Sequence, residues 1–315
     1  MNKKTVLSFI GLIVVVILWG IAPVVSKYLF DNNFYSPALL VAVRGLLACV
    51  TMLVFILITK GFKDVNKSYW ICIPAGVFLG CAYLFQFIGL ESTTPAKNTF
   101  LESLSCIAVP LCMFILVREK PSIASIGAAI ACLIGSFILC GNGWDFSAMF
   151  TSPTIGDILS AIGGIFFGID IAFTKVFAKG KNPYLYVFFQ LIILTIISFA
   201  YALPFEKNLS FSWAFPNIMI LIFLGVLCTA VCWVLRTISI RNVSAVTCAV
   251  LMPMAAVIAT LTSILFRMEA FSWNVIVGGI IITIAIVLSG LYDAKMEKKE
   301  KEVKEVIHDE QNTSE

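Results

Sequence analysis

Ionisable side chains are rare in the long apolar runs of this chain, and two of them lie at comparable depths. Glu102 stands in KNTFLESLSC (97–106) and Arg44 stands in LLVAVRGLLA (39–48), each several residues inside its run. Since a helix rises about 1.5 Å per residue, their depths differ by only a few ångströms. Three interpretations stay open: an ion pair that locks two helices, a carboxylate that binds a small-molecule amine or carries a proton, and a carboxylate that reaches outer water or Lys97.

Three further polar residues are candidates for the same site. Asn98 lies one helical turn before Glu102, on the same face, where it is placed to hold the carboxylate. Asp170 lies deep in a later run, with Lys175 one turn further on. It either pairs with Lys175 or snorkels near the inner surface, or it lines a cavity that favours cationic or zwitterionic molecules. Gln190 lies at a depth comparable to that of Asp170 and joins Arg44 and Glu102 as a candidate ion-pair or coupling residue.

Aromatic and amide side chains fall near the middles of other runs. Trp19, Tyr83, Gln86 and Trp233 are placed either to pack between helices or to contact a bound molecule. A lining that mixes aromatic and polar groups suits small amphiphilic organic molecules. Both interpretations stay open for these four residues.

The remaining composition removes the usual enzyme chemistries. The only histidine, His308, lies in a charged C-terminal tail, which argues against histidine-based metal sites and against Ser-His or Cys-His catalysis. The ten cysteines have no zinc or C-x-x-C spacing and are expected to act as small apolar residues. We therefore predict no catalytic residues, no metal, no cofactor and no nucleic-acid partner.

The overall balance of residues is that of an integral membrane protein. The chain is 60% hydrophobic and 13% charged, whereas soluble domains carry about 45–50% apolar and about 25% charged residues. A bilayer core about 30 Å thick needs roughly 20 apolar residues as helix. Ten segments qualify, at about 6–26, 37–58, 69–90, 96–117, 121–140, 156–177, 183–203, 214–235, 244–266 and 272–292.

Basic residues predict how these spans are oriented. Of the 22 lysines and arginines, only Lys27, Lys97, Lys207 and Arg267 fall in the connections opposite the termini, and Arg44 falls inside a span. All others, including Arg236 and Arg241, fall on the side of the termini. The positive-inside rule then predicts a multi-pass protein of the plasma membrane with both termini cytoplasmic and a charged tail over 293–315.

The chain also resembles itself at an offset of about 148 residues. Trp19-Gly20 matches Phe167-Gly168, and Ser26-Lys27 matches Thr174-Lys175. The matches run in order and align each span with a span. Two halves over 1–145 and 150–292, of five spans each, must lie upside down relative to one another, an arrangement typical of secondary transporters.

Several stretches resemble one known family. ILWGIAPVVSKYL (17–29), LLVAVRGLLA (39–48), the stretch 85–139 and the stretch 250–290 are similar to EamA-type carriers of the drug/metabolite transporter superfamily. The resemblance covers about residues 8–292. It implies two inverted five-helix repeats, export or uptake of small metabolites such as amino acids, and a substrate cavity between the repeats. Position 102 departs from the family pattern, because Glu stands where Thr or another small neutral residue is expected.

These observations predict an all-α integral membrane protein with ten transmembrane helices as two inverted five-helix repeats. The leading hypothesis is a secondary transporter, an exporter or permease, that moves small organic metabolites by alternating access. The alternatives are a channel and a membrane-embedded enzyme acting on lipid-linked substrates. Pro110 and Pro253 should kink the fourth and ninth spans, as hinges or as static bends. The expected partners are a small-molecule substrate and the lipid bilayer, for a monomer or homodimer.

Overall fold

A computed structural model describes residues 3–59, 61–118, 121–140, 154–206, 208–288 and 292 of the chain. Its regular structure is helical, and the predicted charged tail over 293–315 lies outside the described residues. Eight helices are long and apolar enough to cross a membrane, and two shorter apolar helices accompany them at Ile126–Cys140 and Trp273–Leu288. The prediction of an all-helical membrane protein with ten helices is therefore confirmed.

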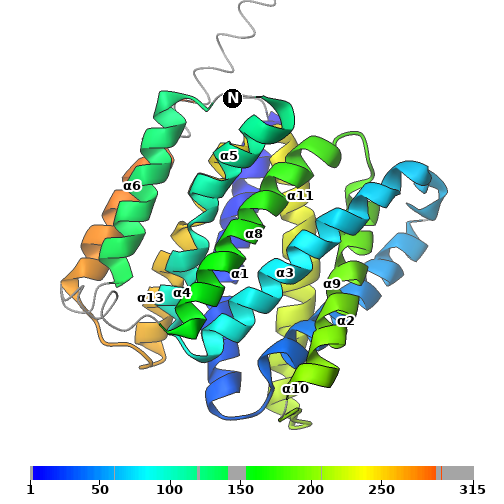
Figure 1. Cartoon of the computed structure of the whole chain (residues 1–315), viewed down its shortest axis with the longest axis horizontal. Coiled ribbons are helices and arrows are strands. Elements are labelled where there is room, and N and C mark those ends of the chain that lie inside the picture. The colour runs from blue at the N-terminus through cyan, green and yellow to red at the C-terminus, as the bar shows by residue number, and fades with distance from the viewer. Residues whose placement is uncertain are drawn as a thin grey trace, which may run out of the picture.

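The first half of the chain supplies five of these segments, whose arrangement Figure 1 shows. Two short 3₁₀ helices, η1 (Gly61–Asp64) and η2 (Lys67–Ile71), precede the third segment. Lys27, which we expected in a connection, lies inside the first helix. The helices are α1 (Lys3–Asp31), α2 (Pro37–Ile58), α3 (Cys72–Glu91), α4 (Pro95–Glu102) with α5 (Ser105–Val117), and α6 (Ile123–Cys140).

The second half supplies the other five. Its third segment is continuous but contains a wider π-helical stretch, η3 (Phe223–Val231), between two α-helices. The helices are α8 (Ile155–Phe177), α9 (Pro183–Phe205), α10 (Phe215–Ile222) with η3 and α11 (Cys232–Asn242), α12 (Ala245–Leu251) with α13 (Met254–Leu265), and the helix Trp273–Leu288.

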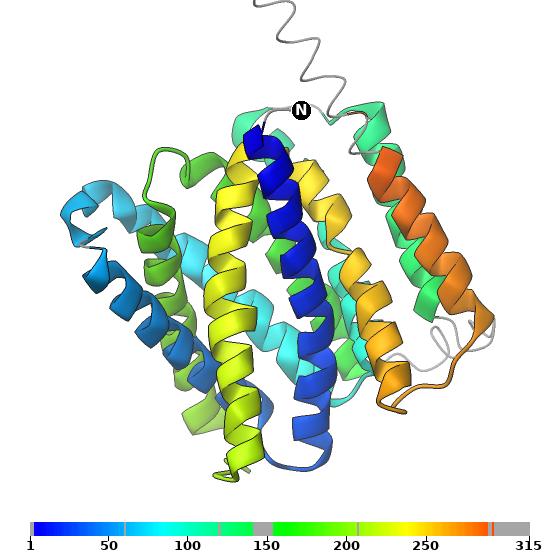
Figure 2. The same cartoon turned by 180° about the vertical axis from the view of Figure 1, so that it is seen from behind.

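The first helix of each half packs against helices of the other half. The first helix of the second half, α8, packs on α3, α4 and α5 of the first half, and α1 in turn packs on α11, α12 and α13. Figure 2 shows α1 lying between α11 and α13. The second helices of the two halves, α2 and α9, pack on each other. This exchange is what two related five-helix units produce when they face each other across a pseudo-two-fold axis.

The two last helices of the halves pair at one edge of the bundle, where Figure 1 shows α6 beside the C-terminal helix. A Cβ atom on Gly278 would lie 2.4 Å from the carbonyl oxygen of Gly135, so the backbones touch there. Asn274 donates to the carbonyls of Ile138 and Leu139. This pair lies away from the interface that the other eight segments share.

Spans four and nine are each interrupted at matching places. The fourth breaks at Ser103–Leu104, between α4 and α5, and the ninth breaks at Met252–Pro253, between α12 and α13. The interruption of the ninth span falls at Pro253, where a kink was predicted. Pro110 lies inside α5, so the interruption of the fourth span occurs about two turns before it.

Glycine residues on α8 allow the break between α4 and α5 to pack directly against the α8 backbone. A Cβ atom on Gly164 would lie 2.5 Å from the carbonyl oxygen of Leu101 and 2.8 Å from the Cα of Glu102. A Cβ atom on Gly168 would meet Ser105 and Ala108. These two glycines let the backbones approach closely, which fixes the end of α4 against the middle of α8.

Candidate functional site

One cavity lies between the two halves, at the level of both helix breaks. The empty space in and around it, including the part that is open to solvent, is about 650 Å³. Ser103 from one break and Met252 from the other are among the residues that line it. Five predicted site residues line it as well: Trp19, Arg44, Tyr83, Gln86 and Glu102.

Arg44 is buried on α2 and reaches across to the second half. Its side chain is 1% exposed, and its Nε donates to the hydroxyl of Thr229 at 3.0 Å. The guanidinium carbon lies 5.1 Å from the ring centroid of Tyr83 and 4.9 Å from that of Phe87. Both distances fall in the range of cation–π contacts. Nη1 is buried without a hydrogen-bond partner.

Glu102 is the last residue of α4 and sits directly at the break. Its carboxylate neighbours the side chain of Gln86 on α3, while Oε1 is buried without a hydrogen-bond partner. Arg44 and Glu102 are not among the ion pairs that the described residues form. The interpretation as an ion pair is wrong because the arginine head is held among Thr229 and two rings. Lys97 does not receive this carboxylate in the structure, since it pairs with Asp157. Glu102 lines the cavity, where its carboxylate stays a candidate for binding a molecule or carrying a proton.

Asp170 forms a buried ion pair with Arg236. Nη1 of Arg236 lies 2.8 Å from Oδ2 of Asp170, and the two side chains are 1% and 0% exposed. Gln190 donates through Nε2 to the other carboxylate oxygen and to the carbonyl of Ala75. Asp170 and Gln190 thus lie behind the cavity and orient Arg236, which lines it.

Two predictions about this region are wrong. Lys175 does not pair with Asp170, since its Nζ donates to the carbonyls of Ile240 and Val243. Arg236 does not belong to a cytoplasmic connection, since it is buried in the segment Phe215–Asn242. The sequence signal for Arg236 was weak, because it stands among polar residues close to the end of that segment.

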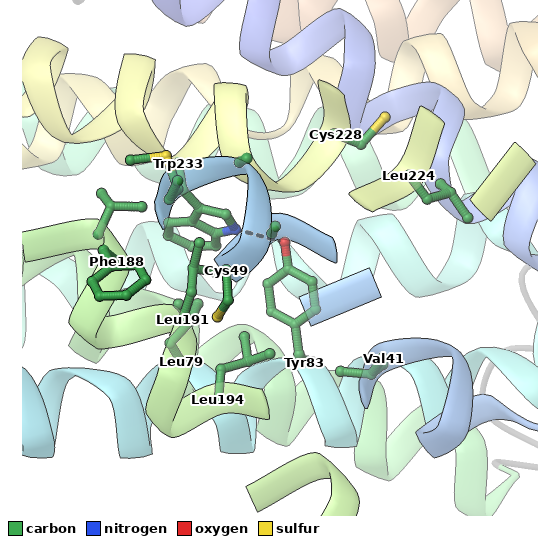
Figure 3. Close-up of a cluster of buried hydrophobic side chains, with 14 of the residues drawn as sticks. Val41, Cys49, Leu79, Tyr83, Phe188, Leu191, Leu194, Leu224, Cys228 and Trp233 are labelled. Carbon is green, nitrogen blue, oxygen red and sulfur yellow. Dashed lines mark hydrogen bonds between the residues drawn. The ribbon is translucent and has the colours of Figure 1, made fainter. Parts of the chain in front are cut away.

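Aromatic rings form the apolar wall of the site. Trp233 is fully buried, and its Nε1 donates to the hydroxyl of Tyr83 at 2.7 Å, as Figure 3 shows. Its ring lies 5.0 Å from Trp19 and is stacked on Phe167 at 6.4 Å, measured between centroids. Nε1 of Trp19 donates to the carbonyl of Cys228. Trp19, Tyr83 and Phe167 line the cavity, while Trp233 supports them from behind.

Asn98 has a supporting role different from the predicted one. It is fully buried, and its Nδ2 donates to the carbonyl of Gln86 and to the hydroxyl of Ser160. It therefore ties α4 to α3 and α8 and does not hold the Glu102 carboxylate.

A polar cluster joins the halves at the N-terminal end of α4. Lys97 pairs with Asp157 of α8 at 2.6 Å, and the hydroxyl of Thr93 donates to the same carboxylate. Glu269, in the connection that follows α13, accepts hydrogen bonds from Thr94 and from the backbone at Ala96. Burial raises the pKa of the Glu269 carboxyl above its ordinary value of 4.5, and those two hydrogen bonds partly oppose that rise. An acid beside the first turn of α4 also suits the positive end of the helix dipole.

Within the part of the chain that the structure describes, no group of three or more His, Cys, Asp or Glu side chains is arranged to hold a metal ion. The ten cysteines are all unpaired, and none is strongly exposed. The site therefore offers two guanidinium groups, one carboxylate and an aromatic wall for non-covalent binding.

Comparison with known proteins places the whole arrangement in a family. The model of the EamA-like transporter family matches residues 6–141 and again residues 154–291. Two successive matches of similar length fit the two halves that exchange helices in the fold.

Three related proteins are named as transporters. A protein from Archaeoglobus fulgidus named "Uncharacterized transporter" is 28% identical over 211 residues, which cover 65% of this chain and 62% of that relative. A second protein of the same name and organism is 22% identical over 93% of this chain and 97% of its own length. The "Uncharacterized inner membrane transporter YicL" of Salmonella typhimurium is 24% identical over 54% of this chain and 55% of its own.

A solved crystal structure, described only as that of a protein, has the same fold. It aligns with a TM-score of 0.71 and 16% identity, covering 93% of this chain and 99% of the other. At this identity the likeness concerns the fold alone.

Proposed function

Because the chain belongs to the EamA-like transporter family, we propose that it is a secondary transporter that moves small organic solutes, amino acids among them, by alternating access. In this proposal it works as an exporter or permease. The two repeats cover residues 1–145 and 150–292, and the solute binds in the cavity between them.

The observation that carries the proposal is the pair of helix breaks at the cavity. Ser103 and Met252 occupy matching places in spans four and nine, and both line the same space. Broken helices in corresponding places of two repeats are the best pointer to a transporter's binding site, because they expose polar backbone only where a cavity can receive it.

The contacts on either side of the cavity supply two gates. On one side α4 packs against α13, and on the other side α5 packs against α12. Each contact joins the first half to the second. Opening one while the other stays closed would expose the cavity to one side of the membrane at a time. The Glu269 contacts with Thr94 and Ala96 belong to the first of these gates. The Lys97–Asp157 pair ties α4 to α8 beside that gate.

The distribution of basic residues supports an orientation with both termini in the cytoplasm. Lys27, Lys97 and Arg267 then lie toward the outside, and the protein resides in the cell's plasma membrane. The gate between α4 and α13 becomes the outer gate, and that between α5 and α12 becomes the inner one.

The test is solute exchange by purified protein in liposomes. A panel of labelled amino acids, purines and organic cations is offered outside, with and without the same unlabelled solute inside. A carrier must show faster uptake when solute is present on both sides, since a loaded carrier returns with its solute. A channel shows no such acceleration. Uptake that is equally fast with and without solute inside the liposomes would therefore overturn the proposal.

A matched pair of variants connects that activity to the cavity. Ala22 lines the cavity, whereas Ala131 on α6 packs in a separate cluster with the C-terminal helix. We expect Ala22→Phe to reduce exchange at least about tenfold and Ala131→Phe to reduce it much less. Equal reductions of exchange by the two substitutions would show that the solute does not bind in this cavity.

A further inference from the structure

Among the described side chains that line the cavity, the buried atoms without a hydrogen-bond partner are mostly donors. Nη1 of Arg44 is buried without a partner, and all three guanidinium nitrogens of Arg236 lack a hydrogen bond of ordinary geometry, although Nη1 keeps its ion contact with Asp170. Among the described residues that line the cavity, Oε1 of Glu102 is the unpartnered acidic acceptor. Buried N–H groups without acceptors are costly, so the site is suited to a molecule that brings acceptors.

The charges of the two arginines are balanced differently. Arg236 is neutralised by Asp170 at 2.8 Å. Arg44 has no acidic partner among the ion pairs that the described residues form. Its Nε meets a hydroxyl, and its flat faces meet the rings of Tyr83 and Phe87. Contacts with aromatic rings offset only part of the cost of burying a cation. An anion bound in the cavity would therefore neutralise the buried charge of Arg44.

The two arginines act on one region of space. Thr229, which holds the head of Arg44, and Arg236 lie seven residues apart in one span. Thr229 lies near the end of the π-helical stretch and Arg236 lies in α11, nearly two turns further on. The two residues therefore lie on roughly the same side of the span, on the order of 10 Å apart along its axis. Tyr83 and Trp233, the rings under the two guanidinium groups, are themselves joined by a 2.7 Å hydrogen bond (Figure 3).

We infer that the transported solute carries a carboxylate group, which Arg44 binds with Arg236 as the second donor. The inference rests on the proposed function, in which this cavity is the solute site. A guanidinium fork matches a planar carboxylate with two parallel N–H···O bonds. The aromatic wall of Trp19, Tyr83 and Phe167 then receives the solute's apolar part, which selects an organic carboxylate. Glu102 meets whatever positive or hydroxyl group the solute carries elsewhere.

Binding of four small probes to the purified wild-type protein tests this inference. The probes share a phenyl group and differ at the polar end: 3-phenylpropanoate, L-phenylalanine, 3-phenylpropanamide and 2-phenylethylamine. Apparent affinities come from the dose dependence of the thermal unfolding midpoint, because a ligand that binds the folded state raises it. We expect both carboxylates to bind about 10- to 100-fold more tightly than the amide and the amine, the range of one lost charge-assisted hydrogen bond.

Variants assign the carboxylate to its partner. Arg44→Gln should lose that preference, and the matched control Arg267→Gln, an exposed arginine outside the cavity, should keep it. Arg44→Lys retains the charge without the fork and should bind 3-phenylpropanoate about tenfold more weakly. Glu102→Gln should leave 3-phenylpropanoate binding unimpaired, and a tenfold loss there would overturn the assignment to Arg44.

Several results would overturn the inference outright. They are equal binding of carboxylates and amide, tighter binding of the amine, failure of both carboxylates to bind the wild-type protein, and an Arg44→Gln protein that keeps the carboxylate preference. If Arg44→Gln does not fold, Arg44→Lys serves as the test instead. Binding of 3-phenylpropanoate by Arg44→Lys with wild-type affinity would then overturn the inference. If the protein binds carboxylates but exchanges no solute in liposomes, the proposed transport function is refuted and the carboxylate site is not. If the protein exchanges a neutral solute but binds no carboxylate, only the carboxylate inference is refuted.

Discussion

Breaking the Asp170–Arg236 pair is the perturbation whose consequences follow most directly from the structure. Both side chains are buried, and the carboxylate also receives a hydrogen bond from Gln190. Asp170→Asn leaves Arg236 as an uncompensated cation, and Arg236→Met leaves Asp170 as an uncompensated anion. The double variant Asp170→Asn/Arg236→Met leaves neither charge.

The size of each effect follows from burial. Removing one partner of a buried ion pair costs about 3–5 kcal/mol of stability, because the remaining charge is left without compensation. Replacing both partners by neutral groups costs much less and is often near neutral. We therefore expect each single variant to lose about 3–5 kcal/mol and the double variant to lose less than either one.

Equilibrium unfolding in mixed detergent micelles, followed by tryptophan fluorescence, measures these free energies as a double-mutant cycle. The Lys27–Asp31 pair supplies a control, since it is partly exposed within α1 and Lys27→Gln should cost at most about 1 kcal/mol. Additive losses in the Asp170 and Arg236 variants, or single losses below about 1 kcal/mol, would show that the two groups are not a buried pair.

Three further predictions concern other parts of the molecule. Because burial raises the pKa of Glu269, folding loses stability as pH rises from the ordinary carboxyl value of 4.5 toward the raised pKa, where the folded protein must hold a buried charge. Glu269→Gln should therefore flatten the fall of the unfolding midpoint that begins as pH rises above 4.5. Trp233→Phe leaves the buried hydroxyl of Tyr83 without its donor and should cost about 1–3 kcal/mol in the same unfolding assay; an unchanged midpoint would refute that bond. Gly164→Val should abolish folded protein on size exclusion, since even a Cβ would lie 2.5 Å from a backbone carbonyl, whereas Gly127→Val on α6 has open space around it and should fold.

Much of the site could be predicted from the sequence because burial in a membrane is so costly for polar groups. Arg44, Gln86 and Glu102 stand out in apolar runs, and all three line the cavity. The central positions of Trp19 and Tyr83 in their spans also favour a place in the site, and both residues line the cavity.

The pairing of these groups could not be predicted from depth alone. Depth along a helix says nothing of the direction in which a side chain points or of which helices are neighbours. Arg44 and Glu102 have similar depths, yet the arginine contacts Thr229 on a helix of the other half. Lys175 lies one turn from Asp170, yet it reaches the carbonyls that end α11.

Arg236 was misplaced for a related reason. The segment Phe215–Asn242 is 28 residues long, well beyond the roughly 20 that a bilayer core requires. A tilted helix can be longer than the roughly 20 residues that are assigned to a span from the sequence. Its last polar turns are then assigned to a connection although they are still helical. Arg236 is fully buried in that stretch, against Asp170 and Trp233.

The central claim, that the cavity at the two helix breaks opens alternately to the two sides, is tested most directly by thiol accessibility at Ser103. This residue lines the cavity, is 1% exposed and sits at the break of the fourth span. If the cavity opens alternately, Ser103→Cys in oriented vesicles reacts with a membrane-impermeant reagent added on either side, faster than the ten native cysteines. A transported solute then slows both reactions. Reaction from one side only under all conditions, or no reaction above the native background, would contradict it.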